Sequence, residues 1–240
     1  MLTTIIVNGA NGKMGSLTAD IIRKTTHLKL LAALDKQDNL DTALKDLKPD
    51  IAIDFTEAST AATNTKIIID NNIRPIIGTS GLQLDEIRTF QQTCKNKKLG
   101  GIIVPNFSLG AVLMMKYAKD AATYFEEVEI IEAHHNQKTD APSGTAKKTA
   151  QLIKAARTNQ PHIVCANADA RGDQTDGVPI HSLRLPGFVA SQKVIFGTKG
   201  ETLTIENHCI DRSAYMAGVL LACRKVADLQ HLAYGLEEIL

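Results

Sequence analysis

The chain has 240 residues, 44% of them hydrophobic and 22% charged, and its formal net charge at pH 7 is +1. This balance is typical of a soluble globular protein with one large or two smaller domains, and it excludes a charged surface built to gather nucleic acid or an anionic membrane. No apolar run is long enough to span a bilayer, the start of the chain lacks a signal-peptide pattern, and the four cysteines form no C-x-x-C pair. We therefore expect a cytoplasmic protein without a disulfide framework.

Short apolar runs alternate with helical patterns over the first part of the chain. The expected strands are 3–8, 28–35, 50–56, 74–80 and 99–106, and the expected helices are 13–23, 57–70 and 84–96. Such alternation predicts right-handed crossovers and a parallel sheet, hence a Rossmann-like α/β domain over residues 1–106. Each expected strand ends in small or polar residues, and ligands of such sheets bind beyond the carboxyl ends of the strands.

The pattern changes after Ser108. A helix over 108–123, a strand over 126–135 and a helix over 145–157 come first, and consecutive strands follow at 162–168, 181–186, 191–198 and 201–209. Strands without intervening helices predict a mixed or antiparallel sheet, so residues 107–211 are expected to form an α+β domain. A last helix from Arg212 to Leu229 is expected to bring 212–240 back onto the first domain.

Three glycines, Gly9, Gly12 and Gly15, follow the first expected strand and open a helix. Small residues there allow a pyrophosphate to approach the helix N-terminal amides, and an acid such as Asp35 at the end of the second strand can accept from ribose hydroxyls. Lys36 can pair with a 2′-phosphate. The pattern therefore predicts a site for NADH, NADPH or both, and the alternative is a plain turn beside an unrelated aspartate.

Two histidines stand side by side in EAHHNQKTDAPSGTA, residues 132–146. A shared metal ion is disfavoured, because His134 and His135 end a strand and point to opposite sides, and neither a cysteine nor a third histidine lies nearby. A hydrogen-bonded loop pair is one remaining interpretation. The other is proton transfer, with the ammonium of Lys138 beside a histidine and a helix start at Ser143 that can receive an anion.

These segments together resemble the dihydrodipicolinate reductase family, nearly from end to end. The resemblance rests on Gly9 to Gly15, Asp54-Phe55-Thr56, Gly78-Thr79-Ser80-Gly81, Asn106 to Gly110, and Glu132 to Ala146. The last stretch is the most specific, since it matches every fixed position of E-x-H-H-x-x-K-x-D-x-P-S-G-T-A.

The resemblance implies an NADH- or NADPH-dependent reductase of a cyclic dicarboxylate in diaminopimelate and lysine biosynthesis, assembled as a homotetramer. It implies that His134 and Lys138 serve proton transfer, and that His135, Gly144 and Thr145 contact substrate carboxylates. It also implies the cofactor contacts, which are Gly9, Ala10, Asn11, Gly12, Lys13, Met14, Asp35, Lys36, Gly78, Thr79, Ser80, Val104, Pro105, Asn106 and Phe107.

One segment departs from a branch of the family. That branch often carries a histidine and an acid near 191–193, where this chain has Ser191, Gln192 and Lys193. We interpret these residues as a surface hairpin, and Arg184 as either a substrate contact or an interface residue. His208 and Arg212 are expected to have structural roles.

Two rival functions stay open at this point. Another two-domain oxidoreductase could use the same crevice on a different acid, and a non-catalytic sensor of dinucleotides could have kept the fold. The set of His134, Lys138 and Ser143-Gly144-Thr145 disfavours both, and a sensor would need no proton donor.

Overall fold

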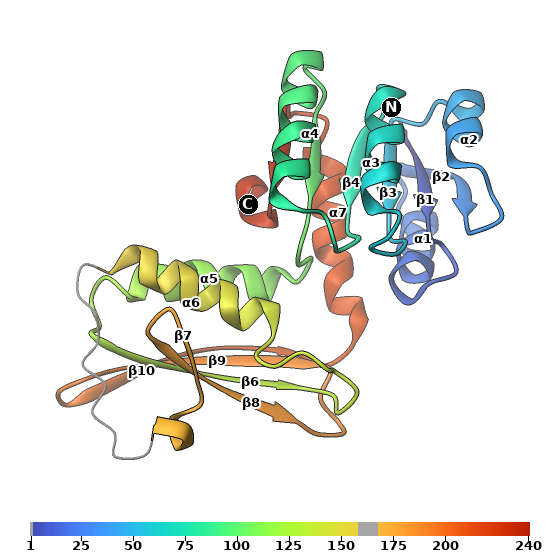
Figure 1. Ribbon diagram of the computed structural model, residues 1–240. Helices are drawn as coiled ribbons and strands as arrows, with labels where there is room; N and C mark the ends of the chain where they lie inside the picture. The colour runs from blue at the N-terminus through green and yellow to red at the C-terminus, as the bar shows by residue number, and fades with distance from the viewer. Residues whose placement is uncertain (1, 158–167) are drawn as a thin grey trace. The chain divides into compact units, whose positions relative to one another are not determined.

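The computed structural model describes residues 2–157 and 168–240. The chain divides into two compact units, Met1–Phe107 with Tyr215–Leu240, and Ser108–Ala214 (Figure 1). The boundaries expected from the sequence fall at 106/107 and 211/212. Residues 162–167 of the strand expected at 162–168 lie outside the described residues.

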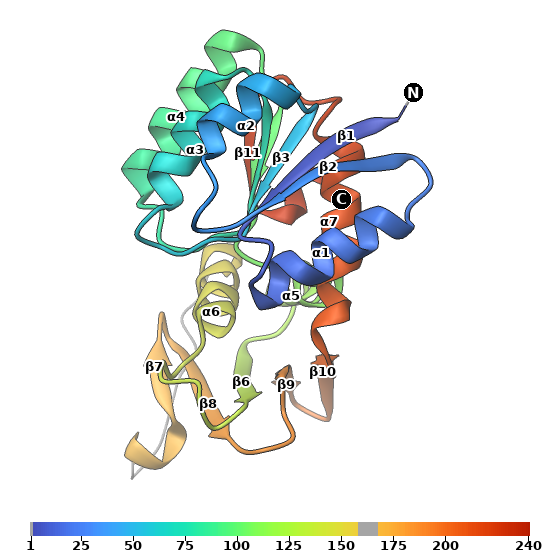
Figure 2. The same ribbon diagram turned by 90° about the vertical axis from the view of Figure 1, so that its right-hand side faces the viewer.

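The first unit contains a sheet of parallel strands in the order β11-β5-β4-β3-β1-β2. Its strands are β1 (Thr3–Asn8), β2 (Leu28–Leu34), β3 (Ile51–Asp54), β4 (Arg74–Ile77), β5 (Gly101–Ile103) and β11 (Leu232–Tyr234). Its helices are α1 (Lys13–Lys24), α2 (Leu40–Leu47), α3 (Ala61–Asp70), α4 (Leu84–Lys97), α7 (Met216–Lys225) and the short η3 (Leu236–Ile239). Helices α2, α3 and α4 cover one face, and α1 and α7 cover the other (Figure 2).

The core of this unit explains why its strands are apolar throughout. All four residues of β3 are buried, and Ile5, Ile6 and Val7 in β1 are 0% exposed. A parallel sheet covered by helices on both faces buries every side chain of its central strands, so these strands do not alternate between apolar and polar residues.

The second unit is a mixed sheet in the order β10-β9-β6-β8-β7. Its strands are β6 (Glu127–His134), β7 (Asp173–Thr175), β8 (Val178–Arg184), β9 (Ala190–Thr198) and β10 (Glu201–Cys209). Strands β6 and β8 are parallel, and the other neighbours are antiparallel. Helices α5 (Leu109–Ala121) and α6 (Gly144–Ala156) both lie on one face of this sheet (Figure 1), and the short η1 (Ala168–Arg171) and η2 (Arg212–Tyr215) complete the unit.

Side chains of β6 alternate between the two faces of this sheet. Val128 and Ile130 are buried beneath the helices, whereas Glu129 and Ile131 are partly exposed on the other face. By the same alternation, Glu132 and His134 belong to the helix-covered face. This placement determines which polar residues of β6 can meet.

The predicted fold class, a Rossmann-like parallel sheet followed by an α+β part with a mixed sheet, is confirmed. Individual elements differ from the expectation. Helix α3 begins at Ala61 rather than at 57, the expected helix 212–229 is the turn η2 followed by the shorter α7, and α2, β7 and β11 were not expected. The missed strands are three residues long, too short for a periodic signal, and β11 is recognisable only through its pairing with β5.

Across residues 2–157 and 168–240, no helix combines the length and the apolar character needed to cross a membrane.

Candidate functional site

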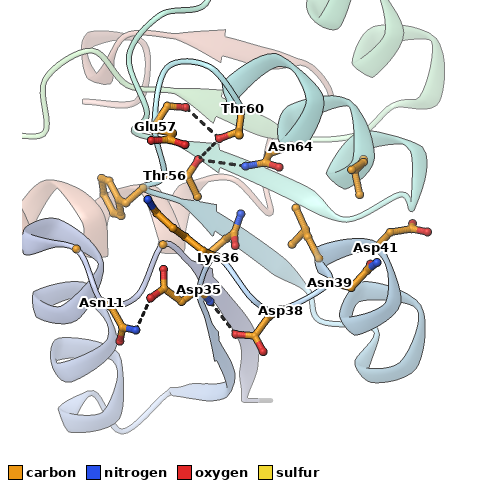
Figure 3. A pocket seen from close by; sticks show the side chains of 16 residues that line it. Asn11, Asp35, Lys36, Asp38, Asn39, Asp41, Thr56, Glu57, Thr60 and Asn64 are labelled. Atoms are coloured by element: carbon orange, nitrogen blue, oxygen red, sulfur yellow. Dashed lines mark hydrogen bonds between the residues drawn. The ribbon is translucent and has the colours of Figure 1, made fainter.

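A pocket of about 810 Å³ lies at the carboxyl edge of the first sheet (Figure 3). The residues that line it are Asn8, Gly9, Asn11, Gly12, Asp35, Lys36, Asp38, Asn39, Leu40, Asp41, Phe55, Thr56, Glu57, Thr60, Asn64 and Ile67. Five of the expected cofactor residues are in this set, namely Gly9, Asn11, Gly12, Asp35 and Lys36. In Figure 3, Asn11, Asp35 and Asp38 lie on one side of the pocket and Thr56, Thr60 and Asn64 on the other.

The glycine turn has the geometry that a close backbone approach requires. Gly9 has a φ of +80°, which disfavours any residue with a side chain. A Cβ on Gly15 would collide with the Gly9 carbonyl oxygen and lie 2.9 Å from the Ala10 Cα, so only glycine lets α1 begin this close to the turn. Gly12 is the N-cap of α1, and within the described residues no side chain caps this helix and no acidic residue stands in its first turn. The helix therefore offers uncapped amides at the pocket, which suits a pyrophosphate.

Asp35 follows β2 and is held by its neighbours. The Asn11 side-chain amide donates to the Asp35 carboxylate, and the backbone N–H of Asp35 donates to Asp38 Oδ2 at 2.8 Å (Figure 3). These hydrogen bonds hold the turn, and the Asp35 carboxylate is directed at the pocket. A carboxylate that accepts from ribose hydroxyls needs this placement. Lys36 also lines the pocket, so a basic side chain stands beside the acid.

A buried carboxylate that the sequence reasoning did not assign organises the loops at this edge. Asp54, the last residue of β3, is 0% exposed and accepts hydrogen bonds from Asn8 Nδ2 at 2.8 Å and from Asn64 Nδ2 at 2.9 Å. Its other oxygen accepts from the hydroxyls of Thr56, at 2.8 Å, and of Thr79. Asp54 therefore joins the ends of β1, β3 and β4. An acid that closes an otherwise apolar strand, as in IAID, was a signal that could have predicted it.

The remaining expected cofactor residues lie on the same unit but do not line the pocket. Gly78, Thr79 and Ser80 follow β4, and Gly78 packs against the rings of Phe55 and Phe107, whose centroids are 5.4 Å apart. Those ring contacts leave no room for a Cβ at Gly78. The others lie in the turn before α1, in its first turn, or in the segment after β5: Ala10, Lys13, Met14, Val104, Pro105 and Asn106.

The second unit places His134, one of the expected proton-transfer residues, beside another buried carboxylate. His134 Nδ1 lies 2.6 Å from Glu132 Oε2. Arg184 binds both oxygens of Glu132, with Nη1 2.9 Å from Oε2 and Nη2 2.8 Å from Oε1, and the backbone N–H of Ser143 donates to Oε1 at 3.1 Å. Burial raises the pKa of Glu132, but hydrogen bonds from His134, Arg184 and Ser182 outweigh it and lower that pKa from 4.5 to about 2. Arg184 is thus a partner of Glu132, a role that neither of its two expected interpretations included.

Lys138 lies on the loop between β6 and α6. Its ammonium contacts both oxygens of Asp140, at 2.7 and 2.9 Å, and its side chain is 23% exposed. The hydrogen bond from Lys138 lowers the pKa of Asp140, so this carboxylate is ionised at neutral pH. Asp140 thereby holds the ammonium of Lys138 on the loop that follows the histidine pair.

The expected carboxylate contacts surround the N-terminus of α6. The Ser143 hydroxyl caps the helix by accepting from the Ala146 N–H at 3.2 Å, as predicted. Gly144 begins the helix with no atom within 4 Å of the position of a Cβ, and Thr145 follows it. His135 Nδ1 is buried and, within the described residues, has no hydrogen-bond partner, so one polar atom of this region lacks a protein ligand.

The surface-hairpin interpretation of residues 191–193 is wrong. Ser191 and Gln192 are 9% and 4% exposed and lie inside β9, where Gln192 is the cross-strand neighbour of Glu132. Gln192 Nε2 donates to Thr149 Oγ1 on α6 at 2.7 Å. The reason is that strand pairing extends to Ala190, and the next two side chains are buried.

His208 and Arg212 lie at the end of β10 and the start of η2, with His208 Nε2 3.3 Å from Glu206 Oε1. Over the described ranges 2–157 and 168–240, no cluster of histidine, cysteine, aspartate or glutamate side chains could hold a metal ion.

These features define a class of protein. A parallel sheet with a glycine turn, an uncapped helix start and an acid after its second strand is a dinucleotide-binding unit. The second unit presents an imidazole, an ammonium and a helix N-terminus, which suit an anionic substrate that must receive a proton. The combination is that of a dinucleotide-dependent oxidoreductase.

Comparison with known proteins names the family. Residues 3–107 match the family model described as dihydrodipicolinate reductase, N-terminus, and residues 110–240 match the one described as dihydrodipicolinate reductase, C-terminus. The chain belongs to the dihydrodipicolinate reductase family. The predicted resemblance is therefore confirmed, and with it the prediction of an NAD(P)H-dependent reductase.

Relatives support this over the whole length of the chain. A 4-hydroxy-tetrahydrodipicolinate reductase of Coxiella burnetii is 50% identical over 240 residues, and one of Legionella pneumophila (strain Paris) is 49% identical over 243, each with 100% of both chains covered. A dipicolinate-bound dihydrodipicolinate reductase from Paenisporosarcina sp. TG-14 has a TM-score of 0.92 at 38% identity, again with 100% of both chains covered. GenD2 from gentamicin A biosynthesis, in complex with NAD, has a TM-score of 0.63 at 14% identity, covering 95% of this chain and 86% of its own, and shares the fold alone.

Proposed function

We propose that this protein reduces 4-hydroxy-tetrahydrodipicolinate to tetrahydrodipicolinate with NADH or NADPH, releasing water, in diaminopimelate and lysine biosynthesis. The observation that carries the proposal is the placement of His134, Lys138 and the N-terminus of α6 around one loop of the second unit. The full-length relatives, which are named 4-hydroxy-tetrahydrodipicolinate reductase, support the choice of substrate.

The first unit fits the dinucleotide. We assign the pyrophosphate to the turn from Gly9 to Met14, because its glycines admit the phosphates and α1 is uncapped. Asp35 accepts from the adenosine ribose, and Lys36 is the candidate partner of a 2′-phosphate. The loops Gly78 to Ser80 and Val104 to Phe107 are assigned further cofactor contacts. When bound, the dinucleotide supplies the hydride.

The second unit fits a small dianion. Lys138 is a cation that can exchange its Asp140 partner for a substrate carboxylate, and Gly144 leaves open space at the start of α6. We assign the second carboxylate to Gly144, Thr145 and His135, whose buried Nδ1 lacks a hydrogen bond within the described residues. Charge-assisted hydrogen bonds of this kind are the strong ones for carboxylates.

Proton transfer falls to His134 or Lys138. Loss of the 4-hydroxyl as water leaves an unsaturated ring conjugated to the imine, and hydride addition at C4 places negative charge that a proton at C3 quenches. His134 can deliver that proton from its imidazolium, while the Lys138 ammonium stabilises the developing charge. The reverse assignment, with Lys138 as the acid, uses the same two groups.

We further propose that the protein is a cytoplasmic homotetramer assembled through the second sheet. Helices α5 and α6 lie on one face of that sheet (Figure 1). On the other face, Ile131 and Ile195 are partly exposed and Leu183 is 37% exposed. These apolar side chains lie among charged ones such as Glu129, and a mixed face of this kind suits an interface between copies of the chain.

The test is oxidation of NADH and NADPH, followed by absorbance, with 4-hydroxy-tetrahydrodipicolinate as the substrate. We expect turnover by the wild type, and a loss of about two orders of magnitude or more in kcat for Lys138→Ala and for His134→Ala. Lys148→Ala, which removes an exposed lysine of α6, is the matched control and should keep full activity. An absence of turnover, or equal rates in all four proteins, would refute the proposal.

A further inference from the structure

We propose that Glu132 is a positioning residue, which holds the imidazole of His134 in one orientation and one tautomer so that its Nε2 is the atom that carries the transferred proton. The proposal rests on the proposed function for the role of His134. The arrangement itself, a buried carboxylate on the Nδ1 side of an imidazole, is independent of the substrate.

Glu132 lies in a buried position, where an ionised carboxylate is costly unless it has hydrogen-bond partners. It is 0% exposed on the helix-covered face of β6, between Ser182 of β8 and Gln192 of β9. Its oxygens are saturated: Oε1 accepts from Arg184 Nη2 and the Ser143 N–H, and Oε2 accepts from Arg184 Nη1 and faces His134 Nδ1. An ionised buried carboxylate is retained only with such a set of donors.

The charge of Glu132 determines the tautomer of His134. Burial raises the pKa of Glu132, but its hydrogen bonds outweigh burial and lower the pKa to about 2, so the group is ionised at neutral pH. An ionised carboxylate only accepts hydrogen bonds. The 2.6 Å contact therefore requires a proton on His134 Nδ1, which leaves Nε2 to take up and release the second proton.

The groups that face His134 set the size of the charge effect. Glu132 lies two residues before it on β6, Arg184 is its cross-strand partner on β8, and Lys138 with Asp140 lies on the loop that follows β6. The cross-strand partner on β9, Ala190, is uncharged, and in the described structure α6 has no acidic residue in its first turn. Arg184 offsets part of the attraction between Glu132 and a protonated His134, so orientation and tautomer account for most of the effect.

The same carboxylate also connects the parts of the site. It binds the backbone at Ser143, directly before the proposed anion site of α6, and Arg184 Nη2 donates to the Asp140 carbonyl oxygen at 2.6 Å. Asp140 in turn holds Lys138. The pair of Glu132 and Arg184 therefore fixes the proton donor, the cationic loop and the helix start relative to one another.

Glu132→Gln is the informative substitution, because it keeps the shape and removes the charge. Its amide nitrogen must replace one oxygen. At either position it would face one donor of Arg184. At Oε1 it would also face the Ser143 N–H, which cannot become an acceptor, whereas at Oε2 it would also face His134 Nδ1, which can. The variant should therefore move the proton of the neutral imidazole from Nδ1 to Nε2. We expect kcat to fall about 10²- to 10⁴-fold, the range for losing an orienting carboxylate, with KM changed much less.

The split between kcat and KM separates positioning from a structural role. A residue that only orients the imidazole should affect kcat and leave substrate binding and folding largely intact. A rise in KM at unchanged kcat, or a loss of activity matched by a loss of folded protein, would contradict the proposal.

A measurement without substrate distinguishes the positioning role of Glu132 from the proposed function. A proton–nitrogen correlation spectrum of the histidine side chains, assigned with His134→Asn and recorded at alkaline pH, reports the tautomer directly. We expect Nδ1–H in the wild type and Nε2–H in Glu132→Gln, and Nε2–H in the wild type would overturn the inference even where turnover is normal. Absent turnover with the expected tautomers would instead refute the proposed function.

Glu129→Gln is the matched control. Glu129 also faces a histidine, with Oε2 2.7 Å from His181 Nε2, but it lies on the opposite face of β6 from Glu132. This variant should keep the His134 tautomer and kcat, with the assembly state checked by size-exclusion chromatography. Loss of activity in both variants at an unchanged assembly state would mean that activity depends on either carboxylate of β6, and would overturn the specific role of Glu132.

Discussion

Replacing Arg184 with methionine should destabilise the second unit more than any surface charge change can. Methionine keeps much of the length of the side chain and removes both donors that bind Glu132 at 2.8 and 2.9 Å. Hydrogen bonds to a charged group contribute about 1.5–3 kcal/mol each, and removing one partner of a buried pair costs about 3–5 kcal/mol. We therefore expect the free energy of unfolding to fall by about 3–5 kcal/mol.

The assay is urea unfolding at pH 7 and a fixed protein concentration, followed by far-ultraviolet circular dichroism, since the chain has no tryptophan to report by fluorescence. The matched control is Lys154→Met, which breaks the Lys154–Asp176 pair in the same unit. Lys154 is 56% exposed there, so its loss should change the free energy by about 0.5 kcal/mol or less. A change below about 1 kcal/mol for Arg184→Met would refute the reasoning that Glu132 depends on its guanidinium partner.

Three further predictions follow from the same contacts. The pKa of Glu132 is lowered from 4.5 to about 2 on folding, so its ionised form contributes about 3 kcal/mol of stability above pH 4.5. That contribution should be lost as pH falls from 4.5 towards 2, and acid unfolding curves of Glu132→Gln should lack this component; identical curves would contradict it. Gly15→Ala places a Cβ against the Gly9 carbonyl and should lower the melting temperature and weaken NADH binding in calorimetry, whereas Ser16→Ala, an exposed neighbour, should not. Asp35→Ala should raise the KM for NADH about 10- to 100-fold and the KM for NADPH less, because it removes a charged acceptor for the ribose hydroxyls; an equal rise for both cofactors would remove Asp35 from the ribose site.

Much of the fold could be predicted because its signals are local. The alternation of apolar runs and helical patterns predicted the parallel sheet, and the change of pattern after Ser108 predicted the mixed one. The glycine turn and Asp35 were recognisable because a positive φ, a close backbone approach and a strand-end acid each restrict the residue type within a few positions. The stretch from Glu132 to Ala146 likewise carries its chemistry in adjacent residues.

Only the tertiary structure decides which residues contact the buried carboxylates. Arg184 is 52 residues from Glu132 in the chain, and only the parallel register of β6 and β8 brings them together. In the same way, Asp54 binds Asn8 of β1, Asn64 of α3, and Thr56 and Thr79 of the loops after β3 and β4. Because side chains alternate along a strand, the order of residues in β6 by itself determines that Glu132 shares a face with Val128 and Ile130. Which cation would neutralise it there depended on strand order and register, because those long-range pairings are decided by packing of the whole sheet and leave no local pattern.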